Sequence, residues 1–71
     1  MKLGIENISP REIQVMQSAA RGESAKETAQ GLVLSIETVK DHRNSARARL
    51  GARNVTHAVA MLVAAGLVGG A

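Results

Sequence analysis

The feature that most limits what this chain can fold into is a helix-start signal that occurs twice near its beginning. A serine is followed three residues later by a glutamate in Ser9-Pro10-Arg11-Glu12 and again in Ser24-Ala25-Lys26-Glu27. In such a capping box, the serine hydroxyl and the glutamate carboxylate accept hydrogen bonds from backbone N–H groups that a first helical turn leaves unpaired. Proline at the first helical position strengthens the first signal. The chain therefore starts with two helices that are separated by a short turn.

Further start and stop signals divide the rest of the chain in the same way. After the first box, apolar residues recur at helical spacing until a glycine ends the run. The stretch Gly31-Leu32-Val33-Leu34 interrupts the second helix and supplies apolar side chains to a tight connection. Ser35 caps a third helix that Gly51 stops, and Asn54 or Thr56 caps a fourth. The predicted helices cover roughly residues 9–21, 24–31, 35–50 and 54–65.

Strands are not expected, because no stretch alternates cleanly between apolar and polar residues. We therefore predict an all-α fold, a single four-helix domain over residues 1–71. A domain of this size buries only about 60% of the surface that its unfolded chain exposes. The chain has no cysteine to form disulfides, and its two histidines lack the further ligands of a metal site. A second subunit remains as the means of adding stability.

The third helix is polar for a chain with so little core to spare. Its inward positions form one narrow stripe, made by Val39, His42, Ala46 and Leu50. We expect the histidine on this stripe to be packed and hydrogen-bonded. The opposite side carries Glu37, Lys40, Asp41, Asn44, Arg47 and Ala48. A helix in the major groove of DNA needs such a hydrogen-bonding face, and a short helix and a turn before it are the arrangement that places it there.

Positive charge is concentrated in the second half of the chain. Residues 1–41 carry five basic and six acidic groups, whereas residues 42–71 carry four arginines and no acidic residue. This suits a polyanion as partner, although a solvated basic face would give the same pattern. The chain has no aromatic residue on which single-stranded bases would stack, so double-stranded DNA is the expected nucleic acid.

In these segments the chain resembles the helix-turn-helix domain of LuxR-type transcriptional regulators. The resemblance runs in order through ISPREIQVM (8–16), GESAKETAQGLVLS (22–35), TVKDHRNSARARLG (38–51) and RNVTHAV (53–59). It implies a four-helix domain whose third helix enters the major groove and whose fourth helix pairs two subunits. No receiver or ligand-sensing domain is recognisable. We expect either a protein without a built-in signal or a piece of a longer chain.

The resemblance also implies roles for individual residues. The positions that read base edges in the family are matched by Lys40, Asp41 and Asn44. Positions that face the phosphate backbone are matched by Ser24, Lys26, Ser35, Thr38 and Arg47, and Arg43 is a further candidate for phosphate. Asp41 either accepts a hydrogen bond from a cytosine amino group or pairs with a neighbouring arginine. For Arg43, an ion pair with Glu12 or Glu27 is the alternative.

Two positions of the third helix depart from the family pattern. Ala46 stands where a large aliphatic residue is usual, and Ser45 stands where an amide side chain is common. At a buried site the loss of a large side chain costs about 2–5 kcal/mol unless neighbours fill the space. Met16 or Leu62 is the candidate for filling it. The basic residues that follow, Arg49 and Arg53, are expected to be solvated charges.

The fourth helix is apolar almost all round. A helix on the surface of a monomer shows a polar side, so this one is expected to be covered on two faces. Closure of the core is assigned to Ala58, Val59 and Leu62. The predicted dimer interface, a contact about a two-fold axis, is a second stripe made by His57, Ala60, Met61 and Ala64. A merely apolar C-terminal segment is the alternative.

These observations favour a sequence-specific transcriptional regulator, bacterial or from a phage, that binds a roughly palindromic DNA site as a homodimer. The alternative is a small interaction protein that pairs through its fourth helix with a larger LuxR-type regulator; RNA polymerase is a further candidate partner. The sequence has no nucleophile–base set and no phosphate loop, so we expect neither an enzyme nor a cofactor. With no signal peptide and no apolar run of about 20 residues, we expect a cytoplasmic protein, associated with the nucleoid when bound to DNA, and no membrane partner.

Overall fold

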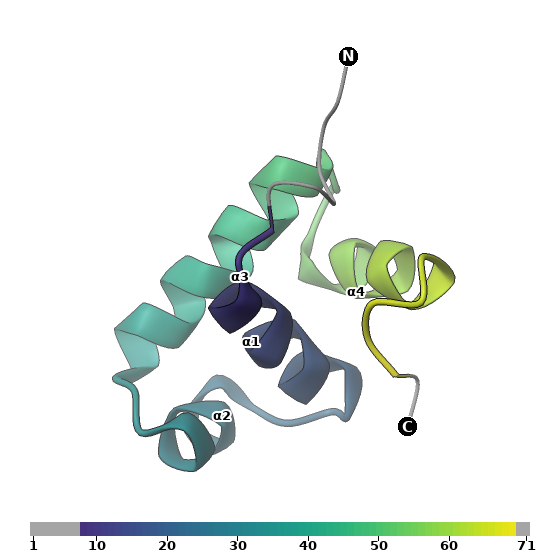
Figure 1. The fold of residues 1–71 in the computed structure, drawn as a ribbon. Coiled ribbons are helices and arrows are strands. Elements are labelled where there is room, and N and C mark those ends of the chain that lie inside the picture. The colour runs from purple at the N-terminus through teal and green to yellow at the C-terminus, as the bar shows by residue number, and fades with distance from the viewer. Residues whose placement is uncertain (1–7, 70–71) are drawn as a thin grey trace.

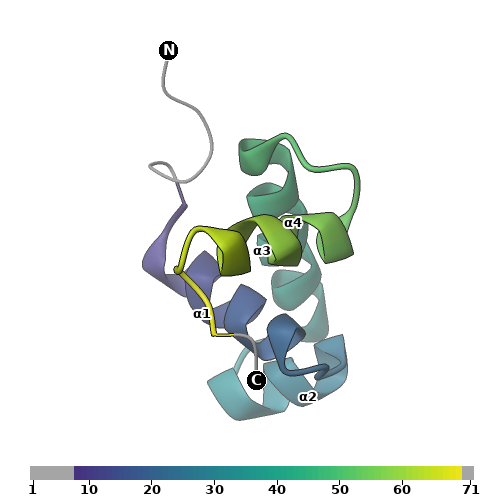
Figure 2. The ribbon, with the colours of Figure 1, turned by 90° about the vertical axis from the view of Figure 1, so that its right-hand side faces the viewer.

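The computed structural model describes residues 8–69 and folds them into four helices without a strand. These are α1 (Pro10–Ala20), α2 (Ala25–Leu32), α3 (Ile36–Leu50) and α4 (Val55–Ala64). In Figure 1, α3 runs along one edge of the molecule and α2 lies near its N-terminal end. Helix α4 crosses α3 in the view of Figure 2. The all-α four-helix fold is confirmed; residues 1–7 and 70–71 of the expected domain lie outside the described part.

The helices begin as their capping signals predict. The backbone N–H of Glu12 donates to Ser9 Oγ at 3.1 Å, and the N–H of Ser9 donates to Glu12 Oε1 at 3.0 Å. The same reciprocal pair opens α2. Ser35 caps α3. Of the two candidates for the cap of α4, the structure uses Asn54, whose Oδ1 accepts from the N–H of His57 at 2.8 Å.

The end of α2 differs from the sequence-based expectation. Gly31 does not break the helix, which continues to Leu32. A glycine inside a helix costs only about 1 kcal/mol, and continuing the helix brings Leu32 against a buried cluster of the core. The cap after α2 is Val33, whose backbone is left-handed with φ 58° and ψ 51°. Its side chain points away from the core and is 89% exposed.

The core consists of two groups of side chains, and α1 contributes to both. The larger group joins α1, α3 and α4 and comprises Met16, Ala46, Leu50, Ala52, Ala58, Leu62 and Val68. The smaller group joins α1, α2 and α3 and comprises Val15, Ala29 and Val39. Met16 and Leu62 are fully buried in the same group as Ala46. This placement agrees with their expected role of filling space beside the small alanine.

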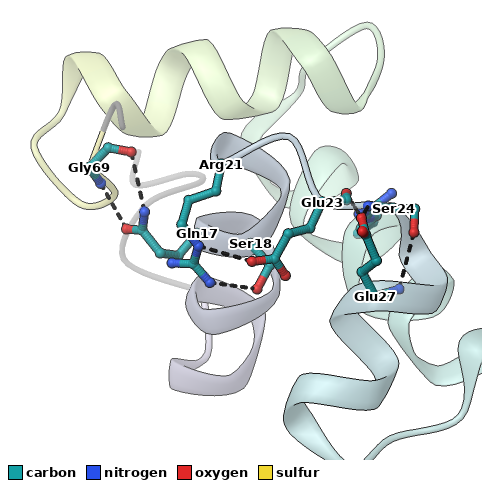
Figure 3. Close-up of polar contacts among 8 residues, drawn as sticks. Gln17, Ser18, Arg21, Glu23, Ser24, Glu27 and Gly69 are labelled. Carbon is teal, nitrogen blue, oxygen red and sulfur yellow. Dashed lines mark hydrogen bonds and ion pairs between the residues drawn. The ribbon is translucent and has the colours of Figure 1, made fainter.

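A polar clip holds the segment after α4 against α1. Gln17 and Gly69 exchange two hydrogen bonds: the Gly69 N–H donates to Gln17 Oε1 at 2.8 Å, and Gln17 Nε2 donates to the Gly69 carbonyl at 3.3 Å (Figure 3). The neighbouring Val68 is buried in the larger core group. The clip therefore holds the segment after α4 against α1. The side of α4 that faces away from α1 stays exposed.

Candidate nucleic-acid interface

The two sides of α3 have separate chemistry, as the sequence predicts. Val39 and Ala46 are fully buried and Leu50 is nearly so. The opposite side is exposed and carries Glu37, Lys40, Asp41, Asn44 and Ala48. One expected feature of the inner stripe is wrong: His42 is only half-buried, and no hydrogen bond joins it to another described residue. We call the exposed residues Glu37, Lys40, Asp41, Asn44 and Ala48 the outer face of α3.

The three candidates for base reading lie together on this face. Lys40 and Asp41 are exposed and have no partner among residues 8–69. Asn44 follows Lys40 by one helical turn, and its Oδ1 accepts a hydrogen bond from Arg47 Nε at 3.1 Å. The amide nitrogen of Asn44 therefore remains able to donate. Asp41 does not pair with a neighbouring arginine here, which removes one of the two interpretations of this residue.

The candidate phosphate-binding groups gather at the N-terminal ends of α2 and α3. Ser35 Oγ accepts from the Thr38 N–H at 3.0 Å and donates to Thr38 Oγ1 at 2.8 Å. The Thr38 hydroxyl keeps its own hydrogen for another acceptor. At the start of α2, Ser24 Oγ accepts from the Glu27 N–H (Figure 3), and the ammonium of Lys26 is exposed. Such groups, together with the partial positive charge of a helix start, suit an anion.

The two helix starts differ in one respect that matters for an anion. At α2, the carboxylate of Glu27 accepts from the Ser24 N–H at 2.8 Å, so negative charge already occupies that helix start. At α3, the third helical position is Thr38, and within the described residues no carboxylate reaches back to Ser35. The start of α3 is therefore the more open of the two to a phosphate oxygen, although Glu37 in its first turn contributes an exposed negative charge.

Of the two interpretations of Arg43, the ion pair with Glu12 or Glu27 is wrong, whereas the contact with phosphate stays a prediction. Nη2 of Arg43 donates to the backbone carbonyl of Glu23 at 3.0 Å, and no ion pair joins this arginine to Glu12 or Glu27 in the described part of the chain. The expected bridge between helices is thus made to a carbonyl oxygen in place of a carboxylate. Arg43 also lines an open hollow of about 350 Å³ between the end of α1 and the start of α4.

Two further arginines of α3 contribute to the fold itself. Arg47 Nη1 donates to the Ala52 carbonyl at 3.2 Å, which ties the end of α3 to the turn before α4. Arg49 is not merely a solvated charge: its Nε lies 3.9 Å from Oε2 of Glu12, a residue only 4% exposed. The capping box of α1 holds that carboxylate where α3 passes, and only the packing of the two helices brings the pair together.

The exposed side of α4 agrees in part with the predicted dimer stripe. His57, Ala60 and Ala64 are exposed, whereas Met61 is half-buried and packs against the larger core group. The imidazole Nδ1 of His57 accepts from the Arg53 N–H at 3.1 Å. Sequence reasoning missed two larger apolar side chains on this side, Val63 and Leu67, each 40% exposed.

Helical spacing from Ala60 was the signal that would have found Val63, because residues three and four positions apart share one side of a helix. Leu67 follows the left-handed Gly66 beyond the end of α4, so helical spacing did not indicate it. We call Ala60, Val63 and Ala64, together with Leu67 of the following turn, the outer face of α4. Among residues 8–69 no helix is long and apolar enough to cross a bilayer, and in the same span no three His, Cys, Asp or Glu residues gather as metal ligands would.

Comparison with known proteins places these features in a family context. Residues 6–62 match the profile of a family described as bacterial regulatory proteins, luxR family. The transcriptional activator protein BjaR1 of Bradyrhizobium diazoefficiens is 39% identical over 56 residues, which are 79% of this chain and 23% of BjaR1. The HTH-type quorum sensing-dependent transcriptional regulator RpaR of Rhodopseudomonas palustris is 39% identical over 61 residues, which are 86% of this chain and 25% of RpaR. The chain thus spans about a quarter of the length of these curated relatives.

Proposed function

The chain belongs to the luxR family of bacterial regulatory proteins and carries its DNA-binding transcription-regulator domain; from this premise we propose that it binds a roughly palindromic site on double-stranded DNA as a homodimer. In this proposal α3 lies in the major groove, and the complex forms in the cytoplasm, on the nucleoid. The observation that carries the proposal is the outer face of α3, which is exposed and polar while the inner side of the same helix is fully buried.

The base-reading step is assigned to Lys40, Asp41 and Asn44. Lysine donates to the O6 and N7 acceptors of guanine, asparagine pairs with adenine, and a carboxylate accepts from the cytosine amino group. Lys40 and Asp41 have no hydrogen bond or ion pair with residues 8–69 that would have to break first. Asn44 either gives up its hydrogen bond from Arg47 to bind the base, or keeps that bond and donates from its amide nitrogen. Asp41, so close to Lys40, gives the face a preference for cytosine amino groups over phosphate.

The positioning step is assigned to the start of α3 and to exposed cations. Ser35 and Thr38 lie at the first turn of α3, where the Thr38 hydroxyl is free to donate to a phosphate oxygen. Ser24 and Lys26 extend this surface at the start of α2. Arg47 adds a cation at the far end of the recognition helix. Arg43 is the weakest member of the predicted set, because it is half-buried and bound to the Glu23 carbonyl.

A homodimer supplies the affinity that a single recognition helix lacks. Two or three base contacts at about 1–3 kcal/mol each give only weak binding and weak discrimination between sequences. Two copies whose recognition helices lie about one helical turn of DNA apart engage both half-sites, and the second contact gains from effective concentration. The outer face of α4 supports this step, because it presents two large apolar side chains, Val63 and Leu67, that the chain itself leaves 40% exposed.

A second function, pairing with a larger LuxR-type regulator through the same face of α4, is favoured by one observation. Asp41 stands on the outer face of α3 and forms no ion pair with any of residues 8–69. A carboxylate in that position repels phosphate, as expected of a domain that withholds its partner from DNA. The two functions are distinguished by whether the isolated protein binds DNA.

The test is selection of bound sequences from a pool of random duplexes, followed by a mobility-shift titration of the winning site. We expect an enriched, roughly two-fold symmetric sequence and a complex that contains two protein chains per duplex. The control is the same titration with a scrambled duplex of equal composition. If no duplex is enriched or shifted even at low salt, the homodimer proposal fails; co-purification with a larger regulator would then favour the second function.

A further inference from the structure

Two large apolar side chains are exposed where α2 turns into α3. Val33 is 89% exposed and Ile36 is 41% exposed. Of the two other exposed large apolar residues of the described chain, Val63 lies on α4 and Leu67 lies in the turn after it. Val33 and Ile36 therefore lie at a separate place in the fold, three residues apart in the sequence, which the proposed dimer contact does not explain.

The backbone conformation of Val33 indicates that its side chain does not stabilise the fold. Its φ of 58° lies in the left-handed region, which is costly for a β-branched residue and easy for glycine or asparagine. Helices that end in this conformation usually have glycine at that position. Val33 buries almost none of its side chain in return. A strained residue that gains no burial is a reason to look for a contact outside the chain.

The position of Ile36 indicates what that contact is. Ile36 is the first residue of α3 and precedes Lys40 by one helical turn, so the two share a side of the helix. In helix-turn-helix proteins the first residues of the recognition helix reach the base edges. The apolar group that the major groove offers there is the C5-methyl of thymine. Two side chains offer too little apolar area for a protein partner. They offer enough to cover one thymine methyl group.

We propose that Ile36, extended by Val33, contacts a thymine methyl group at the edge of each half-site. This inference rests on the proposed function, because it needs α3 in the major groove. It adds a preference for thymine to the hydrogen bonds assigned to Lys40, Asp41 and Asn44. It also gives the α2–α3 turn a role in specificity, where the predicted contacts of its neighbours Ser35 and Thr38 are to phosphate alone.

The test uses deoxyuridine, which lacks only the C5-methyl. Each thymine of the selected site is replaced in turn, and the dissociation constant is measured for every duplex. We expect a loss of about fourfold at the contacted position, the value of one buried methyl group. The Ile36→Ala protein should bind the thymine and deoxyuridine duplexes equally. The control, Gln14→Ala at an exposed position of α1 outside the proposed DNA and dimer contacts, should keep the discrimination of the unchanged protein.

A second variant separates this role from a structural one. Val33→Gly relieves the backbone strain, so its thermal unfolding midpoint should not fall, while its discrimination between thymine and deoxyuridine should decrease. Equal affinity of the unchanged protein for every deoxyuridine duplex, or a selected site without thymine, would overturn the inference and leave the proposed function intact. Failure to bind any duplex would overturn both.

Discussion

Helices α3 and α4 bury their inner sides in the same core group, yet their outer faces have opposite chemistry. On α3 the outer face carries Lys40, Asp41 and Asn44. On α4 it carries alanines together with Val63 and Leu67. A polar face loses little when it stays wet and gains when it meets the groove edges of DNA, whereas an apolar face gains only when water leaves it. The contrast supports the proposal that two different partners cover one small domain.

The comparison also shows that basic residues are not equivalent. Lys40 is exposed and has no partner in the described chain. Arg43 holds the carbonyl of Glu23, and Arg47 holds that of Ala52. Arg49 lies near the carboxylate of Glu12. Part of the positive charge of α3 is therefore used to assemble the four helices, and net charge overstates the number of cations available to phosphate.

The largest expected effect on stability comes from a substitution in the core that α3 and α4 share. Leu62→Ala on the inner side of α4 should lower the free energy of unfolding by about 2–5 kcal/mol, because a fully buried side chain leaves a cavity. Its neighbour Val63 lies on the outer face, so Val63→Ala should stay within about 0.5 kcal/mol. Urea denaturation of both variants measures the difference. Equal losses would show that the two sides of α4 are not distinct.

The next effect compares the two outer faces through one and the same change. Ala60→Glu on α4 should raise the dimer dissociation constant at least about tenfold, since a charge in an apolar contact loses its water. Ala48→Glu on α3 should leave the dimer unchanged and weaken DNA binding, because the new carboxylate approaches phosphate. Sedimentation equilibrium and mobility-shift titration measure the two quantities. A fully dimeric Ala60→Glu protein would place the dimer contact elsewhere.

A smaller effect is expected from removing single cations, and it differs between a cation without an intramolecular partner and one that stabilises the fold. Lys40→Ala should weaken binding to the selected site by about 1–3 kcal/mol and leave thermal stability unchanged. Arg47→Ala should reduce the slope of log affinity against log salt by about one. It should also cost about 0.5–1.5 kcal/mol of stability, because the bond to the Ala52 carbonyl is lost.

Arg53→Ala is the matched control for these two changes. The hydrogen bond from Arg53 to His57 Nδ1 is donated by the backbone N–H and survives the substitution. We expect the stability of this variant to stay near that of the unchanged protein and its affinity to fall less than with Lys40→Ala. A loss of affinity as large as that of Lys40→Ala would mean that total charge, and not the outer face of α3, determines binding.

The smallest effect touches neither outer face. Gly31 is helical and a Cβ added there meets open space, so Gly31→Ala should raise the free energy of unfolding by about 0.5–1 kcal/mol. The same change at Gly51, whose φ is +69°, should lower it. Thermal denaturation of the pair measures both signs. A destabilised Gly31→Ala protein would show that α2 is not a regular helix at that residue.

The sequence by itself was sufficient for the features that depend on near neighbours. The capping boxes at Ser9 and Ser24 link residues three apart, and they start α1 and α2 as predicted. The separation of buried and exposed sides on α3 follows from helical spacing alone. The family resemblance, carried by motifs read in order, is likewise confirmed. Such signals act within one turn of helix, so they can be read before the fold is known.

Only the tertiary structure decided what the side chains do between helices. Arg43 meets a carbonyl oxygen 20 residues away in the sequence, and Arg49 meets the buried Glu12 of α1. The helix that continues through Gly31 and the left-handed backbone of Val33 depend on the packing of Leu32 and Leu34 against the smaller core group. A sequence pattern cannot specify these contacts, because each depends on the distance between helices, which the summed packing of the whole core sets.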